Sequence, residues 1–387
     1  MKAKYLLLLM LGFFCFVNFV NAQDDEEKDK DKKKDRHEFT MVKELKTTPV
    51  KSQAKTGTCW DFATTSFLET ELIRMGKGEY DLSEMFIIHN TYPIKAAKYM
   101  RYMGMGNFGP GGQAHDVLHQ MDKFGAMPEE AYSGIMPGDK EHNHAELENM
   151  LDGILKAALK RTGTKTTTNW KNIVDFTLNE YLGKIPDEFE YKEKKYTPKS
   201  FADELGIKSS DYVELTSFSH HPFYKTFVLE IPDNWTDDEY YNVPIDDILK
   251  VMDYAIDKGY SIAWDGDVGK ENFYSKPGYA VVPVTAEDDQ TKEEKKLPEK
   301  EKQITQADRQ DAFDTYTTTD DHLMHITGVA KDQEGTKFYF TKNSWGTKDR
   351  KYDGFWYMSE PFIRLRTVAI MVHKDAIPQE IKAKLGL

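Results

Sequence analysis

Cysteine is scarce in this sequence, and its scarcity limits the kind of protein that the chain can be. The 387 residues include only two cysteines, and one of them, Cys15, lies in an apolar stretch at the N-terminus. If that stretch is removed, Cys59 is the only thiol, and no internal disulfide can form. An unpaired thiol is a liability in an exported protein, so its retention indicates a chemical role.

The first 22 residues have the pattern of a secretory signal peptide. Lys2 and Lys4 form a basic start, residues 5–19 are mostly apolar, and Val20-Asn21-Ala22 gives a small-residue cleavage pattern. The apolar run is shorter than the roughly 20 residues that a bilayer span needs, which disfavours a retained anchor. We therefore expect cleavage after Ala22 and an exported protein, either periplasmic or secreted.

The sequence also lacks a concentrated basic segment. Its formal net charge is -13, and 13% of its residues are aromatic. The acidic balance argues against nucleic acid or an anionic membrane as a partner. The aromatic residues supply core material for a large globular domain without disulfides. No internal repeat with a period of about 20 to 50 residues is visible.

Two charged stretches interrupt the chain. Residues 24–36 alternate acidic and basic side chains without an apolar anchor, so we expect a disordered spacer over residues 23–38. Residues 286–306 are also highly charged, and we expect them to form a solvated surface loop or a lid. The folded domain is then residues 39–387.

The apolar pattern divides this domain into a helical part and a β-rich part. Helical spacing occurs at residues 59–74, 83–89, 113–124 and 145–159. Short β-rich runs occur at residues 261–264, 279–282, 326–330, 337–342 and 354–358. The pattern indicates an α+β fold, with a helical lobe over residues 55–162, a mixed insertion over 163–247, a β lobe over 248–374, and a short C-terminal helix or tail over 375–387.

Cys59 is a candidate nucleophile because it lies at the start of a predicted helix. A helix N-terminus and a nearby imidazolium both lower the pKa of a thiol. His325 precedes an apolar run that would fix its ring on a strand, and Asn343 lies on the next predicted strand. In an antiparallel pair these two residues could meet and complete a Cys-His-Asn set. His322 is the alternative histidine, but the strand that follows His325 favours His325.

Metal binding has little support in the sequence. His115 and His119 have the i, i+4 spacing of a helical metal pair, but the carboxylate pattern of His-Glu-x-x-His is absent. We therefore predict neither a metal nor another cofactor.

Taken in order, these residues resemble those of papain-fold cysteine peptidases, and within them the bleomycin hydrolase and bacterial aminopeptidase C family. The resemblance extends over residues 42–374. The matching pieces occur in the family's order: Gln53, Gly57-Thr-Cys-Trp-Asp-Phe-Ala63, Asp81-Leu-Ser-Glu-Met-Phe86, Gly111-Gly-Gln-Ala-His-Asp116, Lys123-Phe-Gly-Ala-Met-Pro128, Tyr196-Thr-Pro-Lys-Ser-Phe201, Asn242-Val-Pro-Ile-Asp-Asp-Ile-Leu249, Ala263-Trp-Asp-Gly-Asp-Val-Gly-Lys270, His325 and Asn343-Ser-Trp-Gly346.

The resemblance implies a two-lobe papain-like fold with a role for each catalytic residue. Cys59 would be the nucleophile, and His325 would be the base that becomes imidazolium and then protonates the leaving amine. Asn343 would orient the imidazole ring. Gln53 would donate its side-chain amide, beside the Cys59 backbone N–H, to the oxyanion of the tetrahedral intermediate.

The resemblance also assigns three residues to the substrate-binding part of the site. Gly111 and Gly112 would leave room for the substrate backbone to lie close. Trp345 would shield the histidine–asparagine hydrogen bond from water.

The sequence departs from the family pattern at two places that bear on function. Thr56 stands where papain has a cysteine, which removes a disulfide but no catalytic group. The family also ends in an arm that enters the cleft and captures the amino end of the substrate, whereas only residues 377–387 follow the last predicted strand. The resemblance favours aminopeptidase action on peptides. The short tail leaves endopeptidase action with an open cleft as the alternative, followed by a non-catalytic peptide-binding role. The family further implies a hexamer with enclosed sites.

Overall fold

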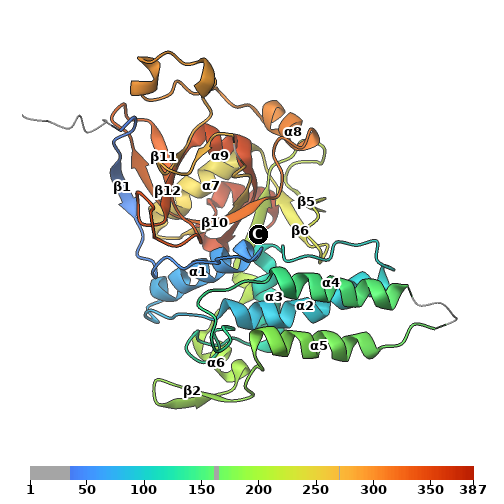
Figure 1. The fold of residues 1–387 in the computed structure, drawn as a ribbon. Coiled ribbons are helices and arrows are strands. Elements are labelled where there is room, and N and C mark those ends of the chain that lie inside the picture. The colour runs from blue at the N-terminus through green and yellow to red at the C-terminus, as the bar shows by residue number, and fades with distance from the viewer. Residues whose placement is uncertain (1–34, 161–164, 270) are drawn as a thin grey trace, which may run out of the picture. The chain divides into compact units, whose positions relative to one another are not determined.

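The computed structural model describes residues 35–160, 165–269 and 271–387 (Figure 1). The expected signal peptide and residues 23–34 of the expected spacer lie outside the described residues.

The first half of the described chain is mainly helical, as the sequence predicts. Its helices are α1 (Cys59–Arg74), α2 (Glu84–Arg101), α3 (Ala114–Phe124), α4 (Ala145–Leu159), α5 (Asn169–Leu182) and α6 (Pro198–Leu205). The Ser83 side chain caps α2 by accepting a hydrogen bond from the Phe86 N–H. This helix extends past the predicted range, continuing through Pro93, because buried Tyr92, Ala96 and Tyr99 pack its far half into the helical core.

The second half contributes most of one large mixed sheet. The sheet order is β5-β6-β4-β13-β7-β10-β11-β12-β9-β8, and β1 pairs with β10 as well. The strands are β1 (Thr40–Glu44), β4 (Tyr212–Thr216), β5 (Lys225–Val228), β6 (Glu239–Asn242), β7 (Ile262–Gly266), β8 (Phe273–Tyr274), β9 (Tyr279–Ala280), β10 (His322–Lys331), β11 (Lys337–Lys342), β12 (Phe355–Ser359) and β13 (Thr367–His373). The remaining helices are α7 (Ile245–Lys258), α8 (Gln306–Asp314), α9 (Glu360–Arg366) and α10 (Gln379–Leu385), and β2 (Phe189–Tyr191) and β3 (Lys194–Tyr196) form a separate hairpin.

The central strands are buried on both faces, and their side chains alternate between two cores. Ala263 of β7 and Leu323 of β10 pack into the core that α1 shares with the other helices. Ile262 and Met324 belong instead to the core that contains α7. Figure 1 accordingly shows α1 between the sheet and the remaining helices of the first half.

The expected mixed insertion, residues 163–247, contributes to both parts. Its α5, β2, β3 and α6 join the helical part, whereas β4, β5 and β6 extend the sheet through the pairing of β4 with β13. The charged residues 286–306 run over the surface with two short 3-10 turns, Glu287–Asp289 and Glu294–Lys296, as expected for a solvated loop.

The expected disordered spacer ends earlier than predicted. His37 is buried, and its ring nitrogens lie 2.7 Å from Glu299 and 3.1 Å from Asp332. Arg36 also pairs with Glu299, at 2.7 Å. The prediction for residues 36–38 was wrong because their partners come from segments about 260 or more residues away, which no local pattern reveals. Within the described ranges, no helix is both long and apolar enough to cross a membrane.

Candidate active site

Cys59 is the first residue of α1 and is half-buried. Helix α1 crosses β10, and the backbone of Leu323 forms a hydrogen bond with the Cys59 thiol. The sulfur therefore lies beside the residue that follows His322. Burial raises the pKa of the Cys59 thiol to about 12, although the Leu323 hydrogen bond acts in the opposite direction. Burial therefore outweighs the lowering of the thiol pKa that the helix start predicts.

His322 and Asn343 form the histidine–asparagine pair of the site. The Nε2 atom of His322 lies 2.8 Å from Oδ1 of Asn343. The same oxygen accepts a 2.7 Å hydrogen bond from the Ser344 backbone N–H, which fixes the orientation of the Asn343 amide. Because Oδ1 can only accept, Nε2 of His322 must carry the hydrogen, and the lone pair of the neutral ring is on Nδ1.

Trp345 lies against this pair. Its ring centroid is 4.8 Å from that of His322, with an angle of 30° between the ring planes. Trp345 also contacts Phe273 and Trp356 of the sheet core edge to face. Burial lowers the pKa of His322 to about 4, while the bond to Asn343 partly opposes this shift. His322 is therefore neutral near pH 7 and can accept a proton.

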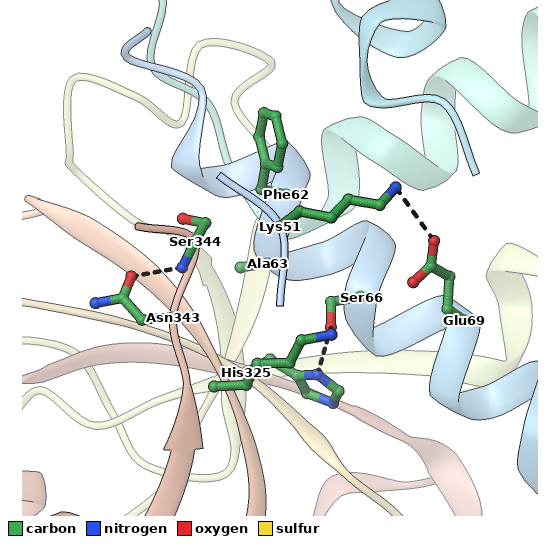
Figure 2. Close-up of a pocket in the computed structure, with 9 residues that line it drawn as sticks. Lys51, Phe62, Ala63, Ser66, Glu69, His325, Asn343 and Ser344 are labelled. Carbon is green, nitrogen blue, oxygen red and sulfur yellow. Dashed lines mark hydrogen bonds and ion pairs between the residues drawn. The ribbon is translucent and has the colours of Figure 1, made fainter. Parts of the chain in front are cut away.

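His325, the histidine favoured by the sequence, does not pair with Asn343, so that prediction is wrong. Its Nδ1 is 2.9 Å from the Ser66 hydroxyl, which also accepts a 2.8 Å hydrogen bond from Lys342 Nζ. Figure 2 shows the Asn343 amide turned away from the His325 ring. Ser66 lies seven residues after Cys59 on α1, which corresponds to about 10 Å along the helix axis.

The alternation of a strand explains why the two histidines have different partners. Residues three apart on a strand face opposite sides of the sheet, so only one of His322 and His325 can reach Asn343. The neighbour of His325 across β11 is Lys342, and both side chains point toward α1. Burial, with the nearby Lys342, lowers the pKa of His325 well below its usual value. His325 is thus a neutral, buried ring on the face of β10 that is turned toward α1.

Gln53 lies in the segment before α1, where the resemblance expects it. Its backbone N–H donates to the Ser344 carbonyl at 2.8 Å, and its side-chain oxygen accepts from the Ser344 hydroxyl at 2.6 Å. Its Nε2 donates to the Thr56 carbonyl at 2.8 Å. Since an amide nitrogen carries two hydrogens, one is left to donate to a substrate oxygen.

Gly111 and Gly112 differ in what covers them. A Cβ atom on Gly111 would lie 1.9 Å from an Asp233 carboxylate oxygen, so Asp233 occupies the space directly over this glycine. A Cβ on Gly112 would meet an Asp116 carboxylate oxygen at 2.8 Å and the Trp60 ring at 2.9 Å. The predicted room for substrate beside Gly111 is therefore filled by an acidic side chain from the loop between β5 and β6.

Three carboxyl groups near Cys59 were not among the residues predicted from the sequence. Asp320 precedes β10, Asp265 lies on β7 and Asp233 lies in the loop after β5, and each of them raises the pKa of Cys59. Asp320 also accepts a 3.0 Å hydrogen bond from Gln113 at the start of α3. Asp320 could have been noticed from its place two residues before His322, whereas Asp233 is 174 residues from Cys59 in sequence and carries no local signal.

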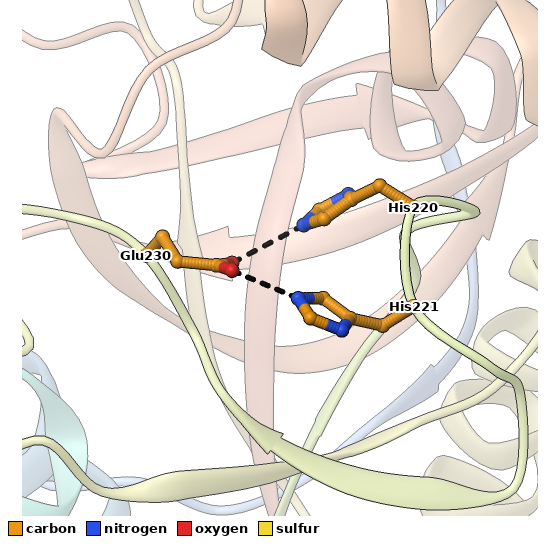
Figure 3. A group of neighbouring side chains, drawn as sticks. All are labelled: His220, His221 and Glu230. Atoms are coloured by element: carbon orange, nitrogen blue, oxygen red, sulfur yellow. Dashed lines mark hydrogen bonds and ion pairs between the residues drawn. The ribbon is translucent and has the colours of Figure 1, made fainter.

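Among the described residues, His220, His221 and Glu230 are the group whose side chains could together hold a metal ion (Figure 3). Nε2 of each histidine faces the Glu230 carboxylate, at 3.2 Å and 2.8 Å. The Gln310 side chain donates to Nδ1 of His220 at 3.0 Å and accepts from the Ser219 backbone N–H. This arrangement places the hydrogen of His220 on Nε2, where a metal would have to bind, so the existing hydrogen bonds already account for the group.

The predicted spacing of His115 and His119 does not give a metal pair. His115 has both ring nitrogens in hydrogen bonds, at 2.7 Å to Glu214 and 2.9 Å to Thr236. His119 lies 3.4 Å from Asp238.

Known proteins are similar to this chain over nearly its whole length. The model of the Peptidase C1-like family matches residues 17–386. Aminopeptidase C of Lactococcus lactis subsp. cremoris is 23% identical over 384 residues, which cover 89% of this chain and 84% of that protein. Bleomycin hydrolase of Mus musculus is 22% identical over 399 residues, covering 90% and 85%. The crystal structure of PepW from Lactobacillus rhamnosis HN001 has a TM-score of 0.70 at 18% identity, covering 90% and 84%.

Proposed function

Because the chain belongs to the Peptidase C1-like family and has the papain-like fold of these cysteine peptidases, we propose that it is an aminopeptidase in which Cys59 is the nucleophile and His322 the base. The hydrogen bond between His322 and Asn343 carries this assignment. It leaves Nδ1 of His322 free to accept a proton, next to the strand residue that contacts Cys59.

Cys59, His322 and Asn343 each have a separate role in the first step of the reaction. The proton of the Cys59 thiol passes to Nδ1 of His322, and the thiolate sulfur then bonds to the substrate carbonyl carbon, whose π-electron pair moves to the oxygen. The proton transfer creates a thiolate and an imidazolium side by side, so neither charge is buried without a partner. This pairing matters because burial opposes ionisation of either group alone. Asn343 keeps its bond to Nε2–H throughout and holds the ring in place.

The intermediate then collapses to the acyl-enzyme. The backbone N–H of Cys59 and the remaining hydrogen of Gln53 Nε2 are the donors available to the oxyanion. The C–N bond breaks, and the Nδ1 proton of His322 passes to the leaving amine. A water molecule next gives a proton to Nδ1 of His322 and attacks the thioester carbonyl carbon. The C–S bond then breaks, the acid is released, and the Nδ1 proton returns to the Cys59 sulfur.

Aminopeptidase action is supported by the names of the relatives, which include aminopeptidase C and, at 23% identity, aminopeptidase E of Lactobacillus helveticus. The second candidate is endopeptidase action. It is favoured by the position of α10, whose Lys382 pairs with Asp375 at 3.2 Å and whose Lys384 lies 3.7 Å from Asp247 of α7. These contacts hold the C-terminal helix against the sheet domain.

A matched pair of substrates tests the choice. An amino-acid amide of a fluorogenic amine and its N-acetylated form differ only in the free amino group. We expect the free form to be cleaved faster and Cys59→Ser to cleave neither. Equal rates for the two forms would favour endopeptidase action, and a Cys59→Ser variant with full activity would overturn the cysteine mechanism.

We also propose that the protein is exported after cleavage following Ala22, on the basis of the pattern in residues 1–22. N-terminal sequencing of the protein from periplasm and medium tests this proposal. A mature chain that starts at Gln23 is expected, and an intact chain confined to the cytoplasm would contradict it.

A further inference from the structure

Arg350 is an unpaired cation in the loop between β11 and β12. Among the described residues its guanidinium has no carboxylate partner and no hydrogen-bond acceptor, and its Nε atom is buried. The neighbouring Lys351, by contrast, pairs with Asp35 at 2.7 Å. A buried N–H group without an acceptor costs free energy, so a ligand that brings an acceptor to Arg350 would remove this cost.

The Arg350 guanidinium lies against two tryptophans. Its central carbon is 5.7 Å from the centroid of the Trp345 ring and 5.5 Å from that of Trp356. Contact with aromatic rings stabilises the positive charge but gives its N–H groups no acceptor. The indole N–H of Trp356 is buried and also lacks an acceptor in the part of the chain that the structure describes. Two neighbouring side chains next to Trp345 therefore have N–H donors without acceptors.

Trp345 brings Arg350 close to the reaction, because the Trp345 ring also lies 4.8 Å from the ring of His322. In the proposed mechanism His322 protonates the leaving amine, so the leaving part of the substrate begins beside this ring. The two distances place the guanidinium carbon at most about 10.5 Å from the centre of the imidazole. One residue spans about 3.5 Å, and a hydrogen bond at each end adds about 3 Å. A carboxylate on the first leaving residue can therefore reach Arg350.

The backbone around Arg350 is held in a turn. The Arg350 N–H donates to the Thr347 carbonyl at 3.2 Å, and the Arg350 carbonyl accepts from the Asp353 N–H at 3.4 Å. Asp321, the acidic residue just before the catalytic histidine, accepts a 3.3 Å hydrogen bond from the Val268 backbone N–H. It forms no ion pair with Arg350, so it does not neutralise the guanidinium charge.

We infer that Arg350 binds a carboxylate on the leaving part of the substrate and so selects peptides with an acidic group directly after the cleaved bond. The inference rests on the proposed roles of Cys59 and His322. A carboxylate has two acceptor oxygens and a negative charge, which match the N–H groups and the charge of a guanidinium. Arg350 is thus a specificity residue and takes no part in bond breaking.

Two parts of a substrate can supply this carboxylate. One is the side chain of an aspartate or glutamate after the cleaved bond, and the other is the C-terminal carboxylate of a dipeptide. Two matched pairs of peptides separate them. Leucyl-aspartic acid α-amide and leucyl-asparagine amide differ only in the side-chain charge. Leucyl-alanine and leucyl-alanine amide differ only at the C-terminus.

The experiment measures release of free leucine from these four peptides by wild type, by Arg350→Gln and by the control Lys348→Gln, which removes an exposed charge from the same loop. In at least one pair we expect wild type to favour the carboxylate member by about tenfold in kcat/KM. Arg350→Gln should bring that ratio close to one, and Lys348→Gln should keep the wild-type ratio. A preference in the first pair assigns the side-chain carboxylate, and one in the second pair assigns the C-terminal carboxylate.

A wild-type protein without a preference in either pair would overturn the inference, and this comparison depends on no variant. A preference that Arg350→Gln retains would overturn it as well. In both cases the peptides are still cleaved and Cys59→Ser is inactive, so the proposed function stands. Cys59→Ser with the wild-type rate, or a wild type that cleaves none of the peptides, would instead contradict the proposed function and the inference together.

Discussion

His322 donates a 2.8 Å hydrogen bond from Nε2 to Oδ1 of Asn343. That oxygen is already fixed as an acceptor by the Ser344 backbone N–H. Which ring nitrogen can act as a base therefore follows from a backbone N–H in the segment directly after β11. The nitrogen of His322 that can accept a proton is therefore Nδ1.

Replacing Asn343 with alanine should lower kcat while leaving KM close to its original value. The ring of His322 would lose the acceptor that orients it, and general-base catalysis as a whole contributes about 10²–10⁴ in rate. We expect a loss of at least about tenfold, measured as kcat on a free amino-acid amide. An unchanged kcat would show that Asn343 does not position the base.

Replacing Gln53 with alanine should also act on kcat. Removing one oxyanion donor typically costs about 10²–10³ in rate. The Ser344 hydroxyl also bonds to Gln53, so Ser344→Ala is the matched control for loss of that contact without loss of the donor. A large defect in Ser344→Ala and a small one in Gln53→Ala would contradict the oxyanion role.

The contact between Ser66 and His325 should matter for stability and not for turnover. Ser66→Ala leaves the buried His325 ring and Lys342 each without one hydrogen-bond partner. We expect unfolding in denaturant to show a loss of about 1–3 kcal/mol. Ser275→Ala, at an exposed serine, is the control, and a loss of turnover in a folded Ser66→Ala protein would contradict this assignment.

The sequence predicted α1 well because its boundaries are local. The apolar stripe from Cys59 onward and the absence of proline and glycine before Gly76 determine a helix that the structure places at Cys59–Arg74. The strands at residues 337–342 and 354–358 were likewise close to β11 and β12. These elements depend on periodicity, which a single sequence contains.

The choice between the two histidines failed for a different reason. The apolar run after His325 suggested a strand that begins there, but β10 begins at His322 and includes both rings. Which face each ring occupies depends on the register with β11, where His325 lies opposite Lys342. Asp233 was missed because its contact with Gly111 joins two loops far apart in sequence, and neither loop has a periodic pattern.

The most direct test of the account compares His322→Ala with His325→Gln. The two measurements are turnover of a free amino-acid amide and the rate at which iodoacetamide alkylates Cys59 near pH 6. The account predicts that His322→Ala lowers turnover by about 10²–10⁴ and slows alkylation, whereas folded His325→Gln keeps both near the wild-type values. A His325→Gln protein that folds but loses both, beside a His322→Ala protein that keeps them, would contradict the account.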